Sequence, residues 1–270
     1  MNRTVGLPGV GQNSTTRGSG VLGEEHQAAS ELAGEAGMRL MELRSRSEPG
    51  RPLGKEGDQL SHQLLMERLA DRFPADRVRS EEADQSKALG TERGRIWIID
   101  PLDGTREYSE GREDWAVHVA LAIDGEPVVG AVALPALDLV LGTGEPPSLS
   151  APAAVPRMVV SRTRPPEFSS FIAQSLGATT IPMGSAGAKI AAVIRGEAEV
   201  YVHAGGQYEW DSAAPVAVAL ASGLHASRLD GSPLRYSQAD PWLPDLVVCH
   251  PTLTDAVTEA LSAFGVSAAG

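Results

Sequence analysis

Residues 97–105 read WIIDPLDGT and constrain this chain more than any other stretch. The aromatic and β-branched residues that open the run favour a buried strand, and Pro101 and Gly104 predict that it stops at Asp100 and turns. Asp100 and Asp103 then lie together at the carboxyl end of a buried strand. Burying even a neutral polar group without a partner costs roughly 2–7 kcal/mol, so we expect a partner. A hard divalent cation, which takes oxygen ligands, is the natural candidate.

Composition limits the classes of protein that fit. The 270 residues suffice for one large domain or two closely packed halves, and the lack of an apolar run of about 18 residues predicts no membrane span. A net charge of −12 argues against a nucleic acid polymer, but it permits a small phosphorylated substrate, because bound metal ions reverse the local field. Residues 1–20 lack an apolar signal core and are predicted to be disordered. Cys249, the lone cysteine, fits a buried thiol in a cytoplasmic protein.

Hydrophobic periodicity divides the chain into two halves, residues 21–155 and 156–270, after the disordered residues 1–20. In the first half we expect helices at 23–46 and from Asp58 as an N-cap, with a loop at 47–57 between them. Strands are expected near Val78 and at 96–99, 115–123 and 128–134, and a Gly- and Pro-rich linker at 142–156. The second half is expected to alternate, with strands at 158–160, 179–183, 200–203 and 246–249 and helices at 167–176, 186–195, 211–222 and from 252. This alternation predicts a layered architecture of sheets between helices.

Two further acidic segments accompany the first. Glu81 and Glu82 follow the strand near Val78, and Asp211 opens a helix as its expected N-cap. Taken singly, each has an ordinary explanation as a solvated loop, a turn or a cap. His118 lies in an apolar run and is expected to be a core residue. Two phosphate-handling alternatives fail on spacing: the haloacid-dehalogenase motif needs Asp-x-Asp-Gly, and the P-loop needs Lys followed by Ser or Thr.

Together these segments resemble the inositol monophosphatase superfamily of metal-dependent, lithium-sensitive phosphatases. The resemblance is carried by the motif at 97–105, the Ser-Glu-Glu at 80–82 and the Trp-Asp-Ser-Ala-Ala-Pro at 210–215, in the family's order, and it covers residues 24–265. It implies an α+β fold, a layered αβαβα sandwich of two packed halves with the metal site between them. It also implies millimolar inhibition by lithium and a homodimer.

The resemblance assigns roles residue by residue. It implies that Glu81, Asp100 and the Leu102 carbonyl bind a first Mg²⁺, and that Asp100, Asp103 and Asp211 bind a second. A third, weaker ion is implied at Glu81 with waters. Such ions would activate a water for in-line attack and stabilise the leaving oxygen. By the same resemblance Thr105 orients that water with Glu81, and the backbone N–H groups of Gly104 and Thr105 hold the phosphate.

The substrate is inferred from residues beyond the metal motif. Glu107 and Tyr108, after Gly-Thr-Arg, resemble 3′(2′),5′-bisphosphate nucleotidases, as does the Gly-Ser/Ala-rich loop 184–189. A lysine beside a metal site suits a second phosphate. The implied substrate-binding residues are Asp103, Gly104, Thr105, Gly184, Ser185, Ala186, Lys189, His203 and Asp211. The implied substrate is adenosine 3′,5′-bisphosphate, with its sulfated form a further candidate.

Two alternatives remain open on the sequence alone. One is a broader inositol monophosphate or fructose 1,6-bisphosphate phosphatase, because the metal site itself sees only a phosphate monoester. The other is a non-catalytic regulator that binds a phosphorylated metabolite, against which the intact acids and Thr105 argue. The 47–57 segment departs from the family pattern, and this departure puts the third metal site in question.

Overall fold

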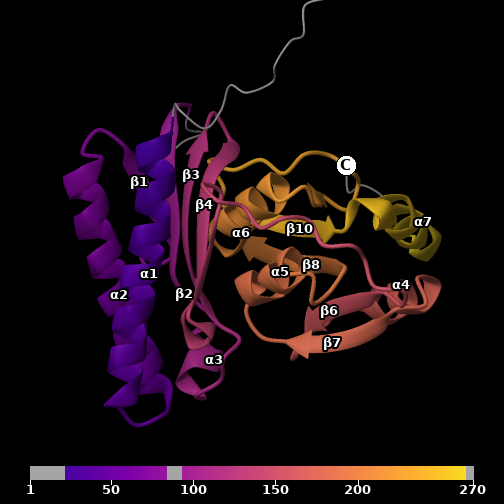
Figure 1. The fold of residues 1–270 in the computed structure, drawn as a ribbon, viewed down its shortest axis with the longest axis horizontal. Coiled ribbons are helices and arrows are strands. Elements are labelled where there is room, and N and C mark those ends of the chain that lie inside the picture. The colour runs from indigo at the N-terminus through magenta and orange to yellow at the C-terminus, as the bar shows by residue number, and fades with distance from the viewer. Residues whose placement is uncertain (1–21, 84–92, 266–270) are drawn as a thin grey trace, which may run out of the picture.

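Two five-stranded sheets are layered between helices (Figure 1). The structure is a computed structural model that describes residues 22–83 and 93–265; the segment 1–20, expected to be disordered, lies outside these residues. The helices are α1 (Gly23–Ser45), α2 (Arg51–Arg72), α3 (Thr105–Ser109), α4 (Ser169–Ser175), α5 (Ala186–Ile194), α6 (Glu209–Ala221) and α7 (Thr254–Phe264), with 3₁₀ turns η1 (Pro135–Leu137) and η2 (Pro251–Leu253).

The first sheet has the order β1-β2-β3-β4-β5 and the second β7-β6-β8-β10-β9. In the first, β1 and β2 are parallel and the other pairs are antiparallel; in the second, β6 is parallel to β7 and β8, and β10 is antiparallel to β8 and β9. The strands are β1 (Arg77–Ser80), β2 (Arg95–Asp103), β3 (Ala116–Ile123), β4 (Glu126–Leu134), β5 (Leu139–Gly142), β6 (Arg157–Ser161), β7 (Thr179–Met183), β8 (Val200–Tyr208), β9 (His225–Ser227) and β10 (Trp242–Cys249).

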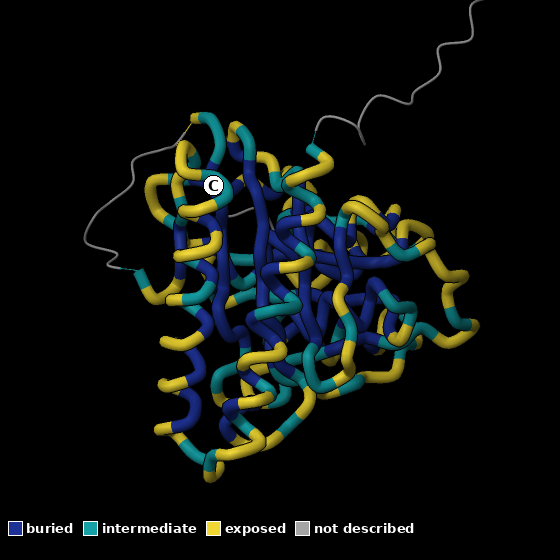
Figure 2. The backbone as a smooth tube through the Cα atoms, turned by 60° about the vertical axis from the view of Figure 1, so that its left-hand side comes forward, coloured by how far each residue is buried: buried dark blue, intermediate teal, exposed yellow. Residues whose placement is uncertain are grey.

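Three core clusters fill the space between the five layers, and one of them covers both sides of the middle layer of α5 and α6. Alternation along β2 sends Trp97 and Ile99 towards α1 and α2, and Ile96 and Ile98 towards α5 and α6. The outer face of the second sheet packs on α4 and α7. Figure 2 shows the strands buried throughout much of their length, with exposed and buried residues alternating on an outer helix. The α+β layered sandwich is therefore confirmed, and no helix of the described residues is long and apolar enough to cross a membrane.

The start of the second helix was predicted wrongly. Helix α2 begins at Arg51 with Pro in its first turn, so residues 51–57 are helical and Asp58 is not an N-cap. Proline fits the first turn of a helix because its missing N–H has no partner there anyway. The glycines that indicated a loop instead permit close packing. A Cβ on Gly54 would lie 2.8 Å from Thr105 Cγ2, and one on Gly57 would lie 3.0 Å from Tyr108 Cε1.

The end of β2 also differs from the prediction. The strand does not stop at Asp100 but runs to Asp103, and its register against β3 shifts between these two residues. A β-bulge of this kind leaves a residue unpaired, so Pro101 breaks no ladder hydrogen bond. The short strands β5 and β9 were not predicted. Residues 143–156 connect β5 to β6, close to the linker expected at 142–156.

Candidate metal centre

Strand register brings the first acids together. Ser80 pairs with Ile99 across the parallel strands β1 and β2, so Glu81 follows β1 at the level where Asp100 lies on β2. The two carboxyls are close enough for the charge of Glu81 to raise the pKa of Asp100, after burial. The bulge beyond Asp100 then turns the chain so that Asp103, three residues on, also faces this site. Carboxylate oxygens of Asp100, Asp103 and Asp211 lie within 4.8 Å of one another, in a group that could hold a metal ion.

Asp211 comes from the other half of the chain. It was expected to be the N-cap of its helix, but α6 begins two residues earlier, at Glu209, with Tyr208 as the N-cap. Asp211 is the third helical residue, and its Oδ2 accepts a hydrogen bond from the Tyr208 backbone N–H at 2.6 Å. A carboxylate at this position satisfies a free N–H of the first turn. The same geometry directs it at the acids of β2.

Burial and mutual repulsion dominate the electrostatics of these acids. Burial raises the pKa of Asp211 to about 7, with the charge of Asp103 adding to it. Glu81 is exposed, but partial loss of solvent around its carboxyl raises its pKa to about 7, and the charges of Asp58 and Asp103 contribute. Asp100 is fully buried, and its pKa is raised well above the ordinary range by burial and then by Glu81. Such acids are costly as close, buried anions without a compensating positive charge.

Asp58 belongs to this cluster although it was predicted only as a helix cap. Its Oδ2 lies 3.1 Å from Thr105 Oγ1, which also lies 3.1 Å from the Leu102 carbonyl oxygen. The single hydroxyl proton can be donated to only one of these acceptors at a time. Burial raises the pKa of Asp58 to about 7, and its Oδ1 is buried with no hydrogen-bond partner. The sequence signal was the Gly54–Gly57 spacing that brings α2 against Thr105.

The start of α5 closes the site from the second half. Ala186 N and Gly187 N donate to the two carboxylate oxygens of Asp103, at 3.2 and 2.5 Å. Ser185, predicted to bind substrate, caps this helix by accepting from Ala188 N at 2.9 Å. The N-terminus of a helix favours a negative charge. The loop thus fixes Asp103, and its link to substrate stays a prediction.

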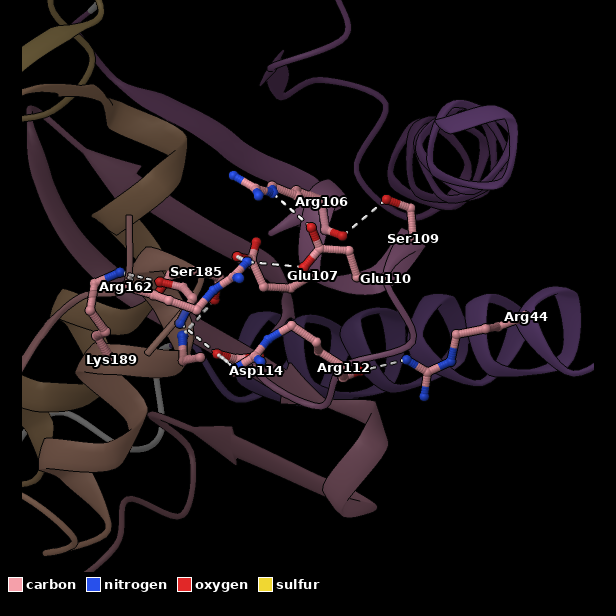
Figure 3. Close-up of polar contacts among 12 residues, drawn as sticks. Arg44, Arg106, Glu107, Ser109, Glu110, Arg112, Asp114, Arg162, Ser185 and Lys189 are labelled. Carbon is pink, nitrogen blue, oxygen red and sulfur yellow. Dashed lines mark hydrogen bonds and ion pairs between the residues drawn. The ribbon is translucent and has the colours of Figure 1, made fainter. Parts of the chain in front are cut away.

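The rest of the 184–189 loop is held by charged side chains. Gly184 N donates to Asp114 at 2.6 Å, and Asp114 in turn pairs with Arg112. Figure 3 shows this pair beside a second one, in which Arg162 reaches the carboxylate of Glu107. Glu107, which was expected to bear on substrate choice, is buried against Gly184. These contacts join the segment after β2 to the second half.

Lys189 contacts its own loop, and its predicted link to a second phosphate stays a prediction. It is buried, and its Nζ donates to the carbonyl oxygens of Gly184 and Ser185 within its own loop. Burial lowers its pKa to about 8, against the opposing charge of Asp103. A buried ammonium that donates two of its three hydrogen bonds to carbonyl oxygens holds the backbone of its loop in place.

Three other side chains complete the comparison with the sequence. His118 is a fully buried core residue, as predicted, and its Nδ1 lies 3.0 Å from the Trp210 carbonyl. His203 is largely occupied by the Gly206 carbonyl, 3.0 Å from its Nε2. Cys249 is buried, as predicted, and burial raises its pKa to about 11.

The donor set fits a hard divalent cation. Every candidate ligand is an oxygen atom, from the buried Asp100 and Asp103, the half-buried Asp211, the exposed Glu81 and the Leu102 carbonyl, and Mg²⁺ and Ca²⁺ prefer such ligands. The raised pKa values of Glu81 and Asp211 point the same way, because a cation between them removes the repulsion that opposes their ionisation.

The sequence profile described as the inositol monophosphatase family matches residues 24–263. The chain therefore belongs to the inositol monophosphatase family, which is metal-dependent, and the resemblance found in the motifs is confirmed.

Individual proteins similar to this chain point to one group within the family. The chain is 50% identical over 242 residues to a protein of Mycobacterium bovis named 3′-phosphoadenosine 5′-phosphate phosphatase, covering 84% of this chain and 90% of that one. It is 28% identical over 232 residues to the 3′(2′),5′-bisphosphate nucleotidase CysQ of Escherichia coli K12, covering 79% and 94%. Among solved structures, CysQ of Bacteroides thetaiotaomicron superposes with a TM-score of 0.75 at 25% identity, covering 84% and 97%. Both named activities are those of phosphoric monoester hydrolases.

Proposed function

We propose that this protein is a Mg²⁺-dependent phosphatase that hydrolyses the 3′-phosphate of adenosine 3′,5′-bisphosphate. One observation carries the proposal: Asp100, Asp103 and Asp211 converge from both halves into an all-oxygen site, in a chain half identical to a named 3′-phosphoadenosine 5′-phosphate phosphatase. A regulator without catalysis has no need to hold several buried acids at such cost. The sulfated nucleotide, 3′-phosphoadenylyl sulfate, is a second candidate substrate.

We assign the metal-binding role to Glu81, Asp100, Asp103, Asp211 and the Leu102 carbonyl. Two or three Mg²⁺ ions would be held there, across the boundary between the halves 21–155 and 156–270. Bound there, the ions would lower the pKa of the attacking water and stabilise the leaving oxygen of the phosphate ester. Asp100 and Asp103 are buried, and burial strengthens the hold of a carboxylate on a cation.

We assign water orientation to Thr105, supported by its contact with Asp58. When the Thr105 hydroxyl donates to the Asp58 carboxylate, 3.1 Å away, the lone pairs of Oγ1 are free to accept a hydrogen bond from an attacking water. As the water loses its proton to Oγ1, the original hydroxyl proton of Thr105 would pass to Asp58. Glu81 keeps its predicted role as the second group that orients the water. The N–H groups of Gly104 and Thr105 are assigned to the phosphate.

We assign binding of the remainder of the substrate to Gly184, Ser185, Ala186 and His203. Lys189 supports this loop, because its Nζ donates to the carbonyl oxygens of Gly184 and Ser185. We further propose inhibition by millimolar lithium, a cytoplasmic location and a homodimer. Exposed Met38, Leu137 and Val140 give the dimer an apolar face near η1.

One assay tests the assignment. Purified protein with Mg²⁺ is offered adenosine 3′,5′-bisphosphate, inositol 1-phosphate and fructose 1,6-bisphosphate in parallel, and phosphate release is measured. We expect the nucleotide to be cleaved with the highest kcat/KM. A preference for either of the other two would overturn the nucleotidase assignment, and no release from any would favour a binding protein. Repeating the assay with lithium tests the inhibition.

A further inference from the structure

A buried ion pair joins the two halves next to the metal centre. Arg79 lies in β1, two residues before Glu81, and Glu209 opens α6, two residues before Asp211. Arg79 Nη1 donates to Glu209 Oε2 at 2.5 Å, and the two side chains are only 6% and 1% exposed. Each member of the pair therefore stands at the same short offset from an acid of the site.

Glu209 is held on more than one side. Its Oε1 accepts a hydrogen bond from Gln238 N at 2.8 Å, and its own backbone N–H donates to the Pro241 carbonyl at 2.9 Å. The carboxylate is thus fixed to the segment that leads into β10 as well as to α6. Because Glu209 cannot follow a displaced Arg79, the pair sets how far β1 lies from the start of α6.

Stability alone is a poor explanation for this pair. Removing two charges from water costs several kcal/mol per ion, and replacing a buried ion pair by apolar residues of similar size is often neutral or stabilising. A charge-assisted hydrogen bond does fix the relative position of its two side chains, because it forms only over a narrow range of distances and angles. The elements that it joins bring acids close together: Glu81 follows β1, and Asp211 lies in α6 with its carboxylate within 4.8 Å of those of Asp100 and Asp103. Such neighbouring carboxylates repel one another.

We propose that Arg79 and Glu209 are positioning residues for the metal centre. Their ion pair holds β1 and α6 at the spacing at which Glu81 and Asp211 can bind cations together. The proposal rests on the metal site assigned above. Loss of a group that orients metal ligands commonly costs about 10–100-fold in metal affinity, and this is the effect expected from removing the pair.

The test is the double variant Arg79→Met/Glu209→Leu, in which no unpaired buried charge remains. Its thermal midpoint is measured across a Mg²⁺ titration, and Mg²⁺ binding is measured by calorimetry. Without Mg²⁺ we expect a thermal midpoint within about 4 °C of the parent protein. The Mg²⁺ concentration that gives half of the maximal stabilisation is expected to rise about tenfold.

A control at a second Arg–Glu pair, whose side chains are 35% and 3% exposed, is Arg157→Met/Glu199→Leu. Arg157 Nη2 lies 2.7 Å from Glu199 Oε1, and Glu199 also accepts a backbone N–H, as Glu209 does. Glu199 precedes β8, whereas α6 follows the other end of that strand. This control is expected to change the thermal midpoint and leave the Mg²⁺ midpoint unchanged. The conservative variant Arg79→Lys keeps a cation beside Glu209 but lacks the planar fork, so an intermediate rise is expected.

The outcomes separate three cases. A double variant with the parent Mg²⁺ midpoint means that the pair only contributes to folding, which overturns the positioning role. If the double variant does not fold, Arg79→Lys decides in its place, and a parent-like Mg²⁺ midpoint there overturns the role equally. A parent protein that Mg²⁺ neither binds nor stabilises would refute the proposed metal site itself, which is a different failure.

Discussion

The two halves of the chain build the metal centre in different ways. In the first half, Asp100 and Asp103 lie on β2, and Glu81 follows the parallel strand beside it, so strand register fixes these acids. In the second half, Asp211 is the single acid of the cluster described at the site, and much of the remaining contribution is backbone, such as the N–H groups that hold Asp103. The first half therefore provides most of the acids, fixed by its sheet, and the second half adds Asp211 and the N–H groups that hold Asp103.

Asp211→Asn gives the largest expected effect, because it removes the charge of the acid that the second half contributes to the described cluster. We expect kcat/KM to fall by more than about 100-fold. Mutation of residues that only hydrogen-bond to metal ligands already lowers metal affinity or activity by about 10–100-fold. Folding is expected to persist, because neutralising one of several mutually repelling acids relieves strain. Phosphate release and circular dichroism check the two parts. Full activity would contradict the assignment of Asp211 as a metal ligand.

Asp58→Asn tests whether the frame of the first half also takes part in the chemistry. An asparagine can still accept a hydrogen bond from Thr105 but cannot take up a proton, so we expect kcat to fall by about 100-fold. The Mg²⁺ requirement is expected to stay near that of the parent protein. A variant with parent-like kcat would leave Glu81 as the group that orients the water.

The metal-free protein should become less stable as the pH rises. Burial raises the pKa of Asp211 to about 7, so between about pH 4 and 7 the folded state binds more protons than the unfolded one, and stability falls as pH increases. We expect the thermal midpoint in chelator to drop by at least about 2–4 °C over this range, as for 1 kcal/mol. Mg²⁺ should remove the drop. A midpoint in chelator that stays level or rises would contradict the raised pKa.

The difference between acids fixed by strand register and groups placed by packing explains which site residues could be predicted from the sequence. The acids of the first half could be predicted, because a buried strand and a fixed spacing place Asp100 and Asp103 without knowledge of the rest of the fold. The role of Asp58 was missed, because the glycines before it indicate a loop until α2 is seen packed on α3. The contacts of Lys189 could not be predicted for a related reason. Whether a lysine faces a ligand or its own loop carbonyls depends on tertiary packing, which periodicity does not record.

A surface ion pair between the halves gives the smallest expected effect and completes the comparison. Arg235 pairs with Glu126 at 2.9 Å, but the side chains are 52% and 64% exposed, so solvent screens their attraction. We expect Arg235→Ala to change the free energy of unfolding by less than about 0.5 kcal/mol, by urea denaturation, with no change in the Mg²⁺ midpoint. A larger effect on either quantity would mean that contact between the halves matters at many points. No effect would locate the coupling in the buried pair beside the acids.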